Sequence, residues 1–238
     1  MINSTDQGKL PKISKLLFII LTSIFVILYF TDETLYRKLI SEDNIIEWLT
    51  FVSLISAGIV SLIIAIKIKK KYKYLHWFFI LFFLFNVLAG FEEISWGQRV
   101  FQVESGEFFQ KHSDQKEINL HNTFQGVFQI KTKHIALILM FIYGVILPWL
   151  IKKEKIKIDW IKNGQLIVPP YFLILGFLLA SVLMLDFQTG HEEELGEFYF
   201  SLCYFLMMIW NLRLLNENSA FNRQSYFNKS KSTPSLNE

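Results

Sequence analysis

The sequence predicts an all-α fold, a polytopic membrane helix bundle of about six transmembrane helices with both termini on the cytoplasmic side. The chain of 238 residues is 52% hydrophobic and 16% aromatic, and its mean hydropathy of +0.34 exceeds the norm for soluble domains. Six apolar runs and a lopsided distribution of charge predict the same class. The single cysteine, Cys203, excludes an intramolecular disulfide and a cysteine-rich metal site.

The six apolar runs each approach the ~20 residues that cross about 30 Å of hydrocarbon. They cover approximately residues 15–31, 46–66, 75–95, 134–151, 166–187 and 196–215. The first run resembles a signal peptide because Lys12 and Lys15 flank it, but no small-residue cleavage site follows, so we expect a retained helix. Residues 1–215 are therefore predicted to form one membrane domain.

Two segments do not fit the pattern of spans joined by short loops. Residues 99–132 mix phenylalanines with polar residues and are too polar to span, so we expect an extracytoplasmic or re-entrant lid. Residues 216–238 are polar and rich in Ser and Asn, which predicts a disordered cytoplasmic tail.

Charge predicts the orientation of the spans. The N-terminus through Lys15, the 67–74 and 152–165 loops and the chain from Arg213 onward together hold 17 of the 24 Lys and Arg but 5 of the 21 Asp and Glu. Such an excess marks the cytoplasmic side, which favours a multi-pass protein of the bacterial cytoplasmic (inner) membrane. The basic runs KIKKKYK (67–73) and KKEKIK (152–157) are typical of anchors near anionic lipid, and we expect no nucleic-acid partner.

The third run ends in an unusual polar stretch, GFEEISWGQR (90–99). On a continuous helix Glu92, Trp96 and Arg99 would form one stripe, with Glu93 beside it. Simpler explanations exist, because Trp96 could be an interfacial aromatic and Arg99 could only pair with a nearby glutamate. Ionisable groups at membrane depth nevertheless usually face a bundle interior or cavity, so this stretch is a candidate functional motif.

Two further helices are predicted to begin with acids at the same membrane face. EDNIIEW (42–48) opens the second span and EEELGEF (192–198) opens the sixth, so Asp43 with Glu47 and Glu193 with Glu197 would be i, i+4 neighbours. Helix capping accounts for the acids of each first turn, with Ser41 as an N-cap and Thr189 with Glu192 as a capping box. Capping does not account for Glu47 and Glu197, which lie one turn deeper.

These acids and the lid sequence EINLHN (117–122) are expected to converge on one site at the outer face. Clustered carboxylates need either a metal ion or protons, and both outcomes suit chemistry. We expect a divalent cation, Zn²⁺, Ca²⁺ or Mn²⁺, as the cofactor. The candidate catalytic residues are Glu92, Glu93, His121 and Arg99, the substrate-binding candidates are Gln98, Trp96 and Asn122, and the metal-ligand candidates are Asp43, Glu47, His191 and Glu197. His121 could equally be a simple loop histidine.

The string EEISWGQR followed by NLHN resembles a motif pair in a family of uncharacterised prokaryotic multi-span membrane proteins. The likeness covers about residues 40–215 and implies no established activity. EDNIIEW is also similar to the acidic opening of an early span in the alkaline ceramidase-like membrane hydrolases. This resemblance implies a bound metal. It would also make Ser95 the counterpart of the serine in their active site. The chain departs from those hydrolases in having six predicted spans rather than seven, and Leu195 stands where the second histidine of their His-x-x-x-His pair would fall.

Two classes of function follow from this predicted site. The first is a membrane-embedded hydrolase or transferase that acts on a lipid or lipid-linked substrate. The second is a small cation-coupled transporter or a cation-binding membrane sensor that uses the same carboxylates. The inner halves of the spans, such as SLIIAI, FFILFFLF and FLMMIW, are almost free of polar residues, which favours the enzyme because a transporter needs a path inward.

Overall fold

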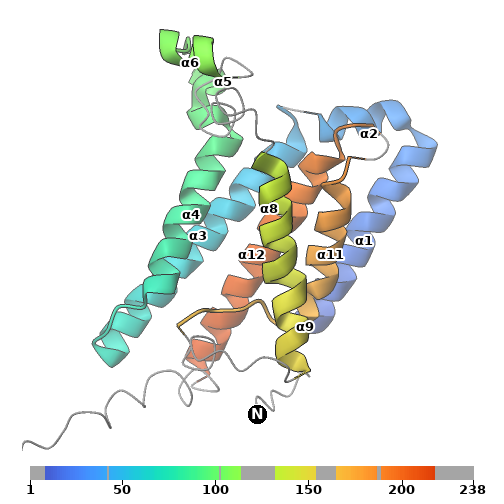
Figure 1. Cartoon of the computed structure of the whole chain (residues 1–238). Helices are drawn as coiled ribbons and strands as arrows, with labels where there is room; N and C mark the ends of the chain where they lie inside the picture. Colours follow the sequence, from blue (N-terminus) through green and yellow to red (C-terminus); the bar gives the residue numbers. More distant parts are fainter. Residues whose placement is uncertain are drawn as a thin grey trace, which may run out of the picture.

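The computed structural model describes residues 9–41, 43–101, 103–113, 132–153, 165–186 and 189–217, and within these ranges every regular element is a helix. The helices form one elongated bundle (Figure 1). In chain order they are α1 (Lys9–Thr31), α2 (Glu33–Ile40), α3 (Ile45–Tyr72), α4 (Trp77–Glu93), η1 (Ser95–Gly97), α5 (Gln98–Phe101), α6 (Glu107–His112), α8 (Thr132–Phe141), the π-helical turn η2 (Ile142–Ile146), α9 (Leu147–Lys152), η3 (Tyr171–Leu173), α11 (Ile174–Leu183) and α12 (Glu192–Asn216).

Four helical stretches are long and apolar enough to cross a membrane, which supports the predicted class. They are Lys9–Thr31, Glu33–Tyr72, His134–Lys152 and Glu192–Asn216. The third and fifth predicted spans are also helical, but α4 has 17 residues and the apolar stretch Tyr171–Leu183 is shorter still. At 1.5 Å per residue α4 covers about 25 Å, less than the ~30 Å of hydrocarbon, so the count of six spans stays a prediction.

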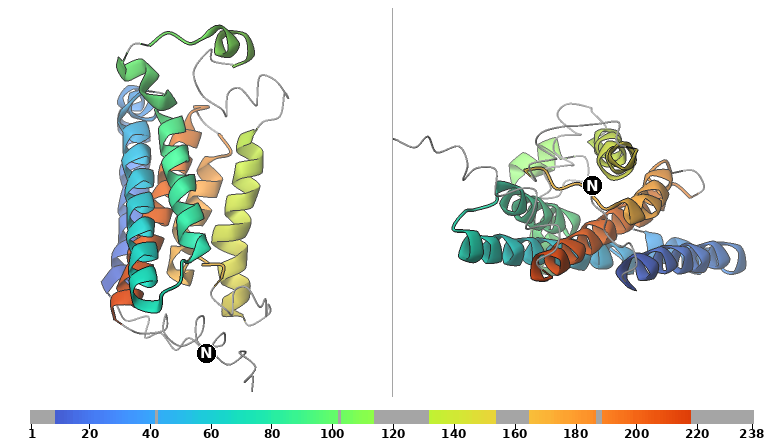
Figure 2. Two further views of the ribbon diagram at one scale, coloured as in Figure 1. Left: turned by 90° about the vertical axis from the view of Figure 1, so that its left-hand side faces the viewer. Right: turned by 90° about the horizontal axis from the view of Figure 1, so that it is seen from below.

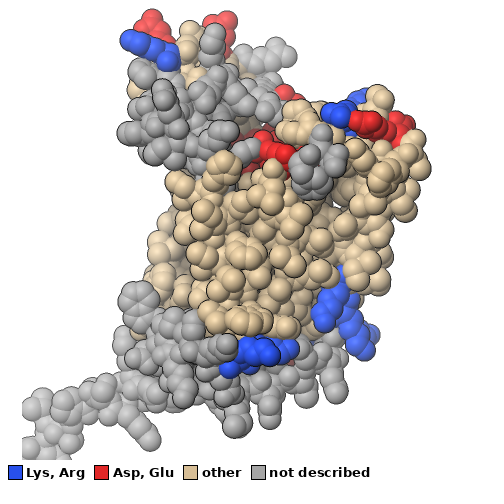
Figure 3. Space-filling model, turned by 45° about the vertical axis from the view of Figure 1, so that its right-hand side comes forward, with Lys and Arg blue, Asp and Glu red and all other residues tan. Residues whose placement is uncertain are grey.

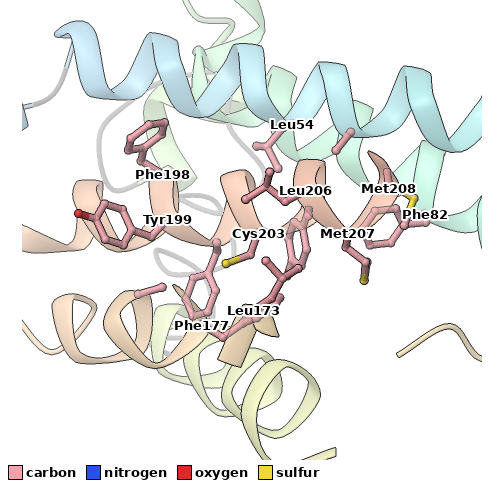
Figure 4. Packing of buried hydrophobic residues seen from close by; sticks show 14 of the residues in the cluster. Leu54, Phe82, Leu173, Phe177, Phe198, Tyr199, Cys203, Leu206, Met207 and Met208 are labelled. Carbon is pink, nitrogen blue, oxygen red and sulfur yellow. The ribbon is translucent and has the colours of Figure 1, made fainter. Parts of the chain in front are cut away.

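The helix α12 lies at the centre of the bundle, packed against α3 on one side and α11 on the other. Several of its large side chains are therefore fully buried, among them Tyr199, Met207 and Met208. Figure 4 shows these α12 side chains between Leu54 of α3 and Phe177 of α11. The helix α1 instead lies at the edge of the bundle (Figure 2) and exposes a long apolar face, as expected for a helix in contact with lipid.

The start of α3 differs from the sequence prediction. Its N-cap is Asn44, and its first helical residue is Ile45, so Asp43 precedes the helix with φ +63°. Asp43 and Glu47 therefore do not form the predicted i, i+4 ladder on one helix face. Ser41 is the C-cap of α2 rather than the N-cap of α3, and its hydroxyl donates to the carbonyl of Lys38.

The backbone of η2 packs closely against α11 at Gly144. A Cβ atom at Gly144 would lie 2.1 Å from the ring of Phe177, so only a glycine allows the ring to pack on the backbone there. Gly144 belongs to the π-helical turn η2, a wider turn that typically interrupts a helix at a packing or functional position. The contact joins α8 to the core formed by α11 and α12.

The two ends of the bundle differ in charge. The last turn of α3 carries Lys69, Lys70 and Lys71, and α9 ends at Lys152, whereas the first turn of α12 is acidic at the opposite end. Figure 3 shows Asp and Glu gathered at that opposite end. We call it the acidic end, and it comprises α2, the first turns of α3 and α12 and the last turn of α4. The predicted N-in, C-in topology would place the acidic end outside the cell.

Candidate functional site

Three glutamates from two helices meet at the acidic end. Glu93 is the last residue of α4, while Glu194 and Glu197 lie in the first two turns of α12. Each offers one carboxylate oxygen, and these oxygens all lie within 4.8 Å of one another. All three side chains are half-buried. We call Glu93, Glu194 and Glu197 the carboxylate triad.

The N-terminus of α12 is held in place by acids that do not belong to the triad. Glu192 accepts hydrogen bonds from the backbone N–H of Thr189 (2.8 Å) and Gly190 (3.2 Å) and from the Thr189 hydroxyl (2.8 Å). The backbone N–H of Glu193 donates to Asp186 Oδ1 (2.8 Å) at the end of the preceding segment. Thr189 and Glu192 are thus bonded to each other, but the N-cap of α12 is His191, so the predicted capping box does not form. These bonds set the direction in which the next turn presents Glu194 and Glu197.

Close packing brings α12 against α11 beside the triad. A Cβ atom at Gly196 would lie 2.8 Å from Met184 Cγ and 3.0 Å from the Ala180 carbonyl oxygen. Glycine at this position lets the backbone of α12 approach α11 directly. This contact fixes the backbone next to Glu197, so the position of the Glu197 side chain relative to α11 is fixed as well.

The helix α4 ends immediately after Glu93 in an unusual turn. Ser95, Trp96 and Gly97 all have positive φ, of 45°, 56° and 75°. Left-handed backbone is costly for the two residues with side chains, and such strain concentrates at functional sites. The turn stops α4 at the depth where Glu93 meets α12.

The predicted stripe of Glu92, Trp96 and Arg99 is wrong, because α4 ends before Trp96. Two of these residues still meet: Trp96 Nε1 donates to Glu92 Oε1 at 2.6 Å, and the indole ring stacks on Phe91. Glu92 is therefore engaged by Trp96 and is not a member of the triad. The side chain of Arg99 lies outside the described residues.

Glu47 adds a fourth carboxylate near the triad. Its side chain accepts a hydrogen bond from the backbone N–H of Asp43 (2.5 Å) and is buried. Its charge acts on Glu93 from α3, and the Glu93 carboxylate lies close to that of Glu197. Carboxylates so close together repel one another unless a cation or protons neutralise part of their charge.

The other predicted metal ligands lie apart from this cluster. His191 is exposed at the N-cap position of α12 and is not part of the triad. Asp43 donates its backbone N–H to Glu47, and no metal-binding group among the described residues includes its carboxylate. His121 and Asn122, together with the rest of EINLHN, fall outside the described residues.

Glu194 is the triad member that sequence reasoning did not select as a site residue. Its spacing from Glu197 is i, i+3, so the two side chains share a helix face, and this pattern was visible in the sequence. The first-turn position of Glu194 favoured the simpler capping interpretation, since acids there stabilise a helix start. Glu194, rather than Glu192 or Glu193, belongs to the triad because it is the first-turn acid that lies next to Glu93 of α4 in the folded chain.

The described part of the predicted lid is tied together by polar side chains. Gln98 Nε2 donates to Ser105 Oγ (2.7 Å), and Gln110 Nε2 donates to the Ser105 carbonyl oxygen (2.8 Å). Gln98, predicted to bind substrate, thus anchors the segment that runs above α4 to the short helix α6 (Figure 1). Ser105 and Gln110 are anchors that sequence reasoning missed, because neither belongs to a recognisable motif.

The fold and these residues define an all-helical membrane protein with a cluster of carboxylates at one end of the bundle. In comparisons with known proteins, no family model, no curated protein and no solved structure matches the chain. The two resemblances drawn from EEISWGQR, NLHN and EDNIIEW therefore stay predictions, and function is inferred from the site itself.

Proposed function

We propose that the chain is a membrane-embedded hydrolase or transferase that acts on a lipid or lipid-linked substrate, with a divalent cation held by the carboxylate triad. The observation that carries this proposal is the meeting of Glu93 with Glu194 and Glu197, whose oxygens lie within 4.8 Å of one another. Charged groups at the end of a membrane bundle are costly unless they bind something. A cation would remove the repulsion among these carboxylates.

The donor set favours particular metals. The triad offers carboxylate oxygens alone, and oxygen ligands suit Ca²⁺, Mn²⁺ or Mg²⁺ better than Zn²⁺, which usually takes at least one histidine or cysteine. Glu47 is close enough to act electrostatically on Glu93 and adds negative charge to the site. Of the metals expected from sequence, Ca²⁺ and Mn²⁺ therefore fit the described residues best.

The arrangement supports hydrolysis or group transfer in two ways. A bound divalent cation supplies Lewis-acid polarisation of a carbonyl or phosphoryl oxygen. With the triad occupied by the cation, the buried Glu47 beside it would be the carboxyl group left to act as general acid or base. The lid anchored by Gln98 lies at the same end of the bundle and would limit access of water. Arg99, His121 and Asn122 remain candidates for binding the polar part of the substrate.

The proposed setting is the bacterial cytoplasmic membrane, with six spans, both termini inside and the acidic end at the outer leaflet. The charge difference between the two ends supports this orientation, because Lys-rich helix ends stay in the cytoplasm. A lipid of the outer leaflet would then present its head group at the level of the triad.

A cation transporter or cation-binding sensor is the alternative use of the same carboxylates. Transport requires a polar route from the triad to the other end of the bundle. The core below it is dominated by buried apolar residues such as Phe82, Met207 and Met208 (Figure 4). Asn86 is a buried polar residue two turns below Glu93, but its amide nitrogen donates to its own helix, at the Phe82 carbonyl. The enzyme is therefore the better-supported proposal.

Metal analysis of purified protein tests the proposal directly. We expect wild-type protein incubated with Mn²⁺ or Ca²⁺ and desalted to retain about one ion per chain, and the Glu93→Gln and Glu194→Gln variants to retain much less. Glu33→Gln is the matched control, because Glu33 is an exposed residue of α2 that pairs with Arg37.

Turnover of lipids by the same proteins in liposomes then separates the two functions. Metal-dependent release of head group or acyl chain, lost in Glu93→Gln, supports the enzyme. If the protein binds metal and takes cations up into the liposomes but turns over no lipid, the transporter replaces the enzyme as the proposed function. Absence of both metal and turnover would remove the proposal altogether.

A further inference from the structure

A chain of aromatic rings follows the surface of α3 and α4 at the acidic end and does not include the carboxylate triad. The ring centroids of Trp48 and Phe51 are 5.8 Å apart, and those of Phe51 and Phe91 of α4 are 6.1 Å apart. Trp96 in η1 then stacks on Phe91 at 5.6 Å. Trp48, Phe91 and Trp96 are 41%, 37% and 43% exposed, so these three rings face the surroundings of the bundle rather than its core.

The position of these rings matches one boundary of a hydrocarbon layer. From Glu47 to Lys67, α3 carries no charged residue over about 30 Å of helix. The hydrocarbon core of a bilayer is about as thick. Trp48 directly follows Glu47, so the rings lie where the hydrocarbon ends and the lipid head groups begin. Tryptophan is enriched at this level because its ring is apolar and its N–H is polar.

The left-handed turn at the end of α4 directs Trp96 to this boundary. On a continued helix Trp96 and Phe91, five residues apart, would lie on different faces. The positive φ of Trp96 and of its two neighbours instead folds the indole back onto Phe91. The indole N–H donates to Glu92 Oε1, so its polar group is satisfied while the ring stays exposed. Contact of that ring with lipid would help to offset the cost of left-handed backbone at two residues with side chains.

Phe101 extends the aromatic surface onto the base of the lid. It is the last residue of α5, which lies directly beyond the end of α4 (Figure 1), and it is 77% exposed. Its ring lies 3.1 Å from the position that a Cβ atom at Gly97 would take, so it is beside the turn that contains Trp96. On the bundle side of that turn, the exposed residues Leu88 and Leu84 lie on successive turns of α4. An apolar surface therefore runs from the middle of α4 to Phe101.

We propose that Trp96 and Phe101 anchor the end of α4 and the base of the lid in the interfacial layer of a lipid bilayer. The partner is a lipid surface, because a soluble partner would not account for the apolar residues of α4 that continue the same surface into the bundle's apolar length. Glu93 lies between Phe91 and Trp96 in the chain, so the anchor sets its depth at the level of the lipid head groups. This inference depends on the membrane class of the protein and not on metal binding or catalysis.

Spin labels measure this depth in the full-length protein reconstituted in liposomes. The labels are attached at Phe101→Cys, at Leu84→Cys in the middle of α4 as the lipid reference, and at Lys111→Cys in α6 as the water reference. Their accessibility to oxygen, which concentrates in lipid, is compared with their accessibility to a nickel chelate that stays in water. We expect the ratio of oxygen to nickel accessibility at Phe101→Cys to exceed that at Lys111→Cys severalfold and to stay below that at Leu84→Cys. The native Cys203 is buried and should remain unlabelled.

Tryptophan variants test the anchor itself. In protein labelled at Phe101→Cys, we expect Trp96→Ser to shift the accessibility ratio towards the value for Lys111→Cys, and Trp96→Phe to preserve it because an aromatic ring remains. Trp77→Ser is the matched control, because Trp77 is also 43% exposed but lies at the opposite end of α4. A label at Leu84→Cys reports whether each variant keeps the packing of α4.

Three results would overturn the proposal. A Phe101→Cys label as accessible to nickel as the Lys111→Cys label would place the base of the lid in water. A label protected from both reagents would mean that protein, not lipid, covers this surface. Equal effects of Trp96→Ser and Trp77→Ser would mean that Trp96 is not the anchor. Glu93→Gln should keep the wild-type depth, so loss of the metal site and loss of the anchor are distinguishable.

Discussion

Glu93 of α4 and Glu197 of α12 come from distant parts of the chain and bring their carboxylates together at the acidic end of the bundle. With Glu194 they place three carboxylate oxygens within 4.8 Å. The two helices carry these acids at opposite ends: Glu93 closes α4, whereas Glu197 lies near the start of α12. Because the helices run in opposite directions, their acidic ends meet, and the site results from the antiparallel arrangement.

The triad should make stability depend on divalent cations. We expect Mn²⁺ or Ca²⁺ to raise the melting temperature of the wild-type protein, since a ligand at one hundred times its Kd stabilises by about 2.7 kcal/mol. The Glu93→Gln and Glu197→Gln variants should lose this effect. Without added metal each variant should melt at or above the wild-type temperature, because one repelling charge is gone. Differential scanning fluorimetry in detergent, with Glu33→Gln as control, measures both values, and an equal metal response in all four proteins would contradict the prediction.

The contact between Gly144 and Phe177 should tolerate no side chain. Gly144→Ala would place a methyl group 2.1 Å from the Phe177 ring, and we expect overpacking to cost about 1–3 kcal/mol of unfolding free energy. Gly106→Ala is the matched control, because no atom lies within 4 Å of its added Cβ. Thermal unfolding followed by circular dichroism measures the difference. A Gly144→Ala variant as stable as the wild type would show that the Phe177 ring does not pack against the backbone at Gly144.

The bond between Gln98 and Ser105 should hold the lid to the end of α4. In a double-mutant cycle with Gln98→Ala and Ser105→Ala, we expect a coupling free energy of about 0.5–1.5 kcal/mol. Local opening measured by hydrogen exchange of residues 103–113 is the appropriate quantity, because a short segment at the end of a bundle opens at lower free energy than the bundle core. Additive effects of the two changes would mean that the bond does not contribute.

The orientation of the protein can be tested with introduced cysteines. The native Cys203 is buried, so it should not react with a membrane-impermeant maleimide. We expect Lys111→Cys in α6 to react in intact cells and Lys70→Cys at the end of α3 to react only after the membrane is permeabilised. The reverse pattern would invert the topology and place the triad at the cytoplasmic leaflet.

The sequence was sufficient for the class of fold and for the end of the bundle at which the carboxylates gather. Hydrophobicity can be read directly from the sequence, so the apolar runs correctly predicted a bundle of helices, four of them long and apolar enough to cross a membrane. The net charge of the loops likewise predicted that acids gather at one end. Glu93 and Glu197 could be selected because carboxylates so deep in apolar segments exceed what helix capping requires.

The sequence predictions were wrong mainly about where helices begin and end. A continuous helix through GFEEISWGQR was a reasonable expectation, but Ser95, Trp96 and Gly97 turn into left-handed backbone and stop α4 at Glu93. Asp43 likewise precedes α3 rather than joining it. Helical propensity depends on each residue and its near neighbours in sequence. The ends of α4 and α3 also depend on packing against other helices, which the sequence does not display.

By itself, the sequence determined that this protein is built from apolar helices and that its acids gather at one end, because each property depends on residue type and on local spacing. Which acids touch was decided only by the tertiary structure. Glu194 joins Glu93 and Glu197 while Glu92 bonds Trp96, a choice set by the antiparallel contact of α4 with α12 and by the close packing of Gly196 against α11.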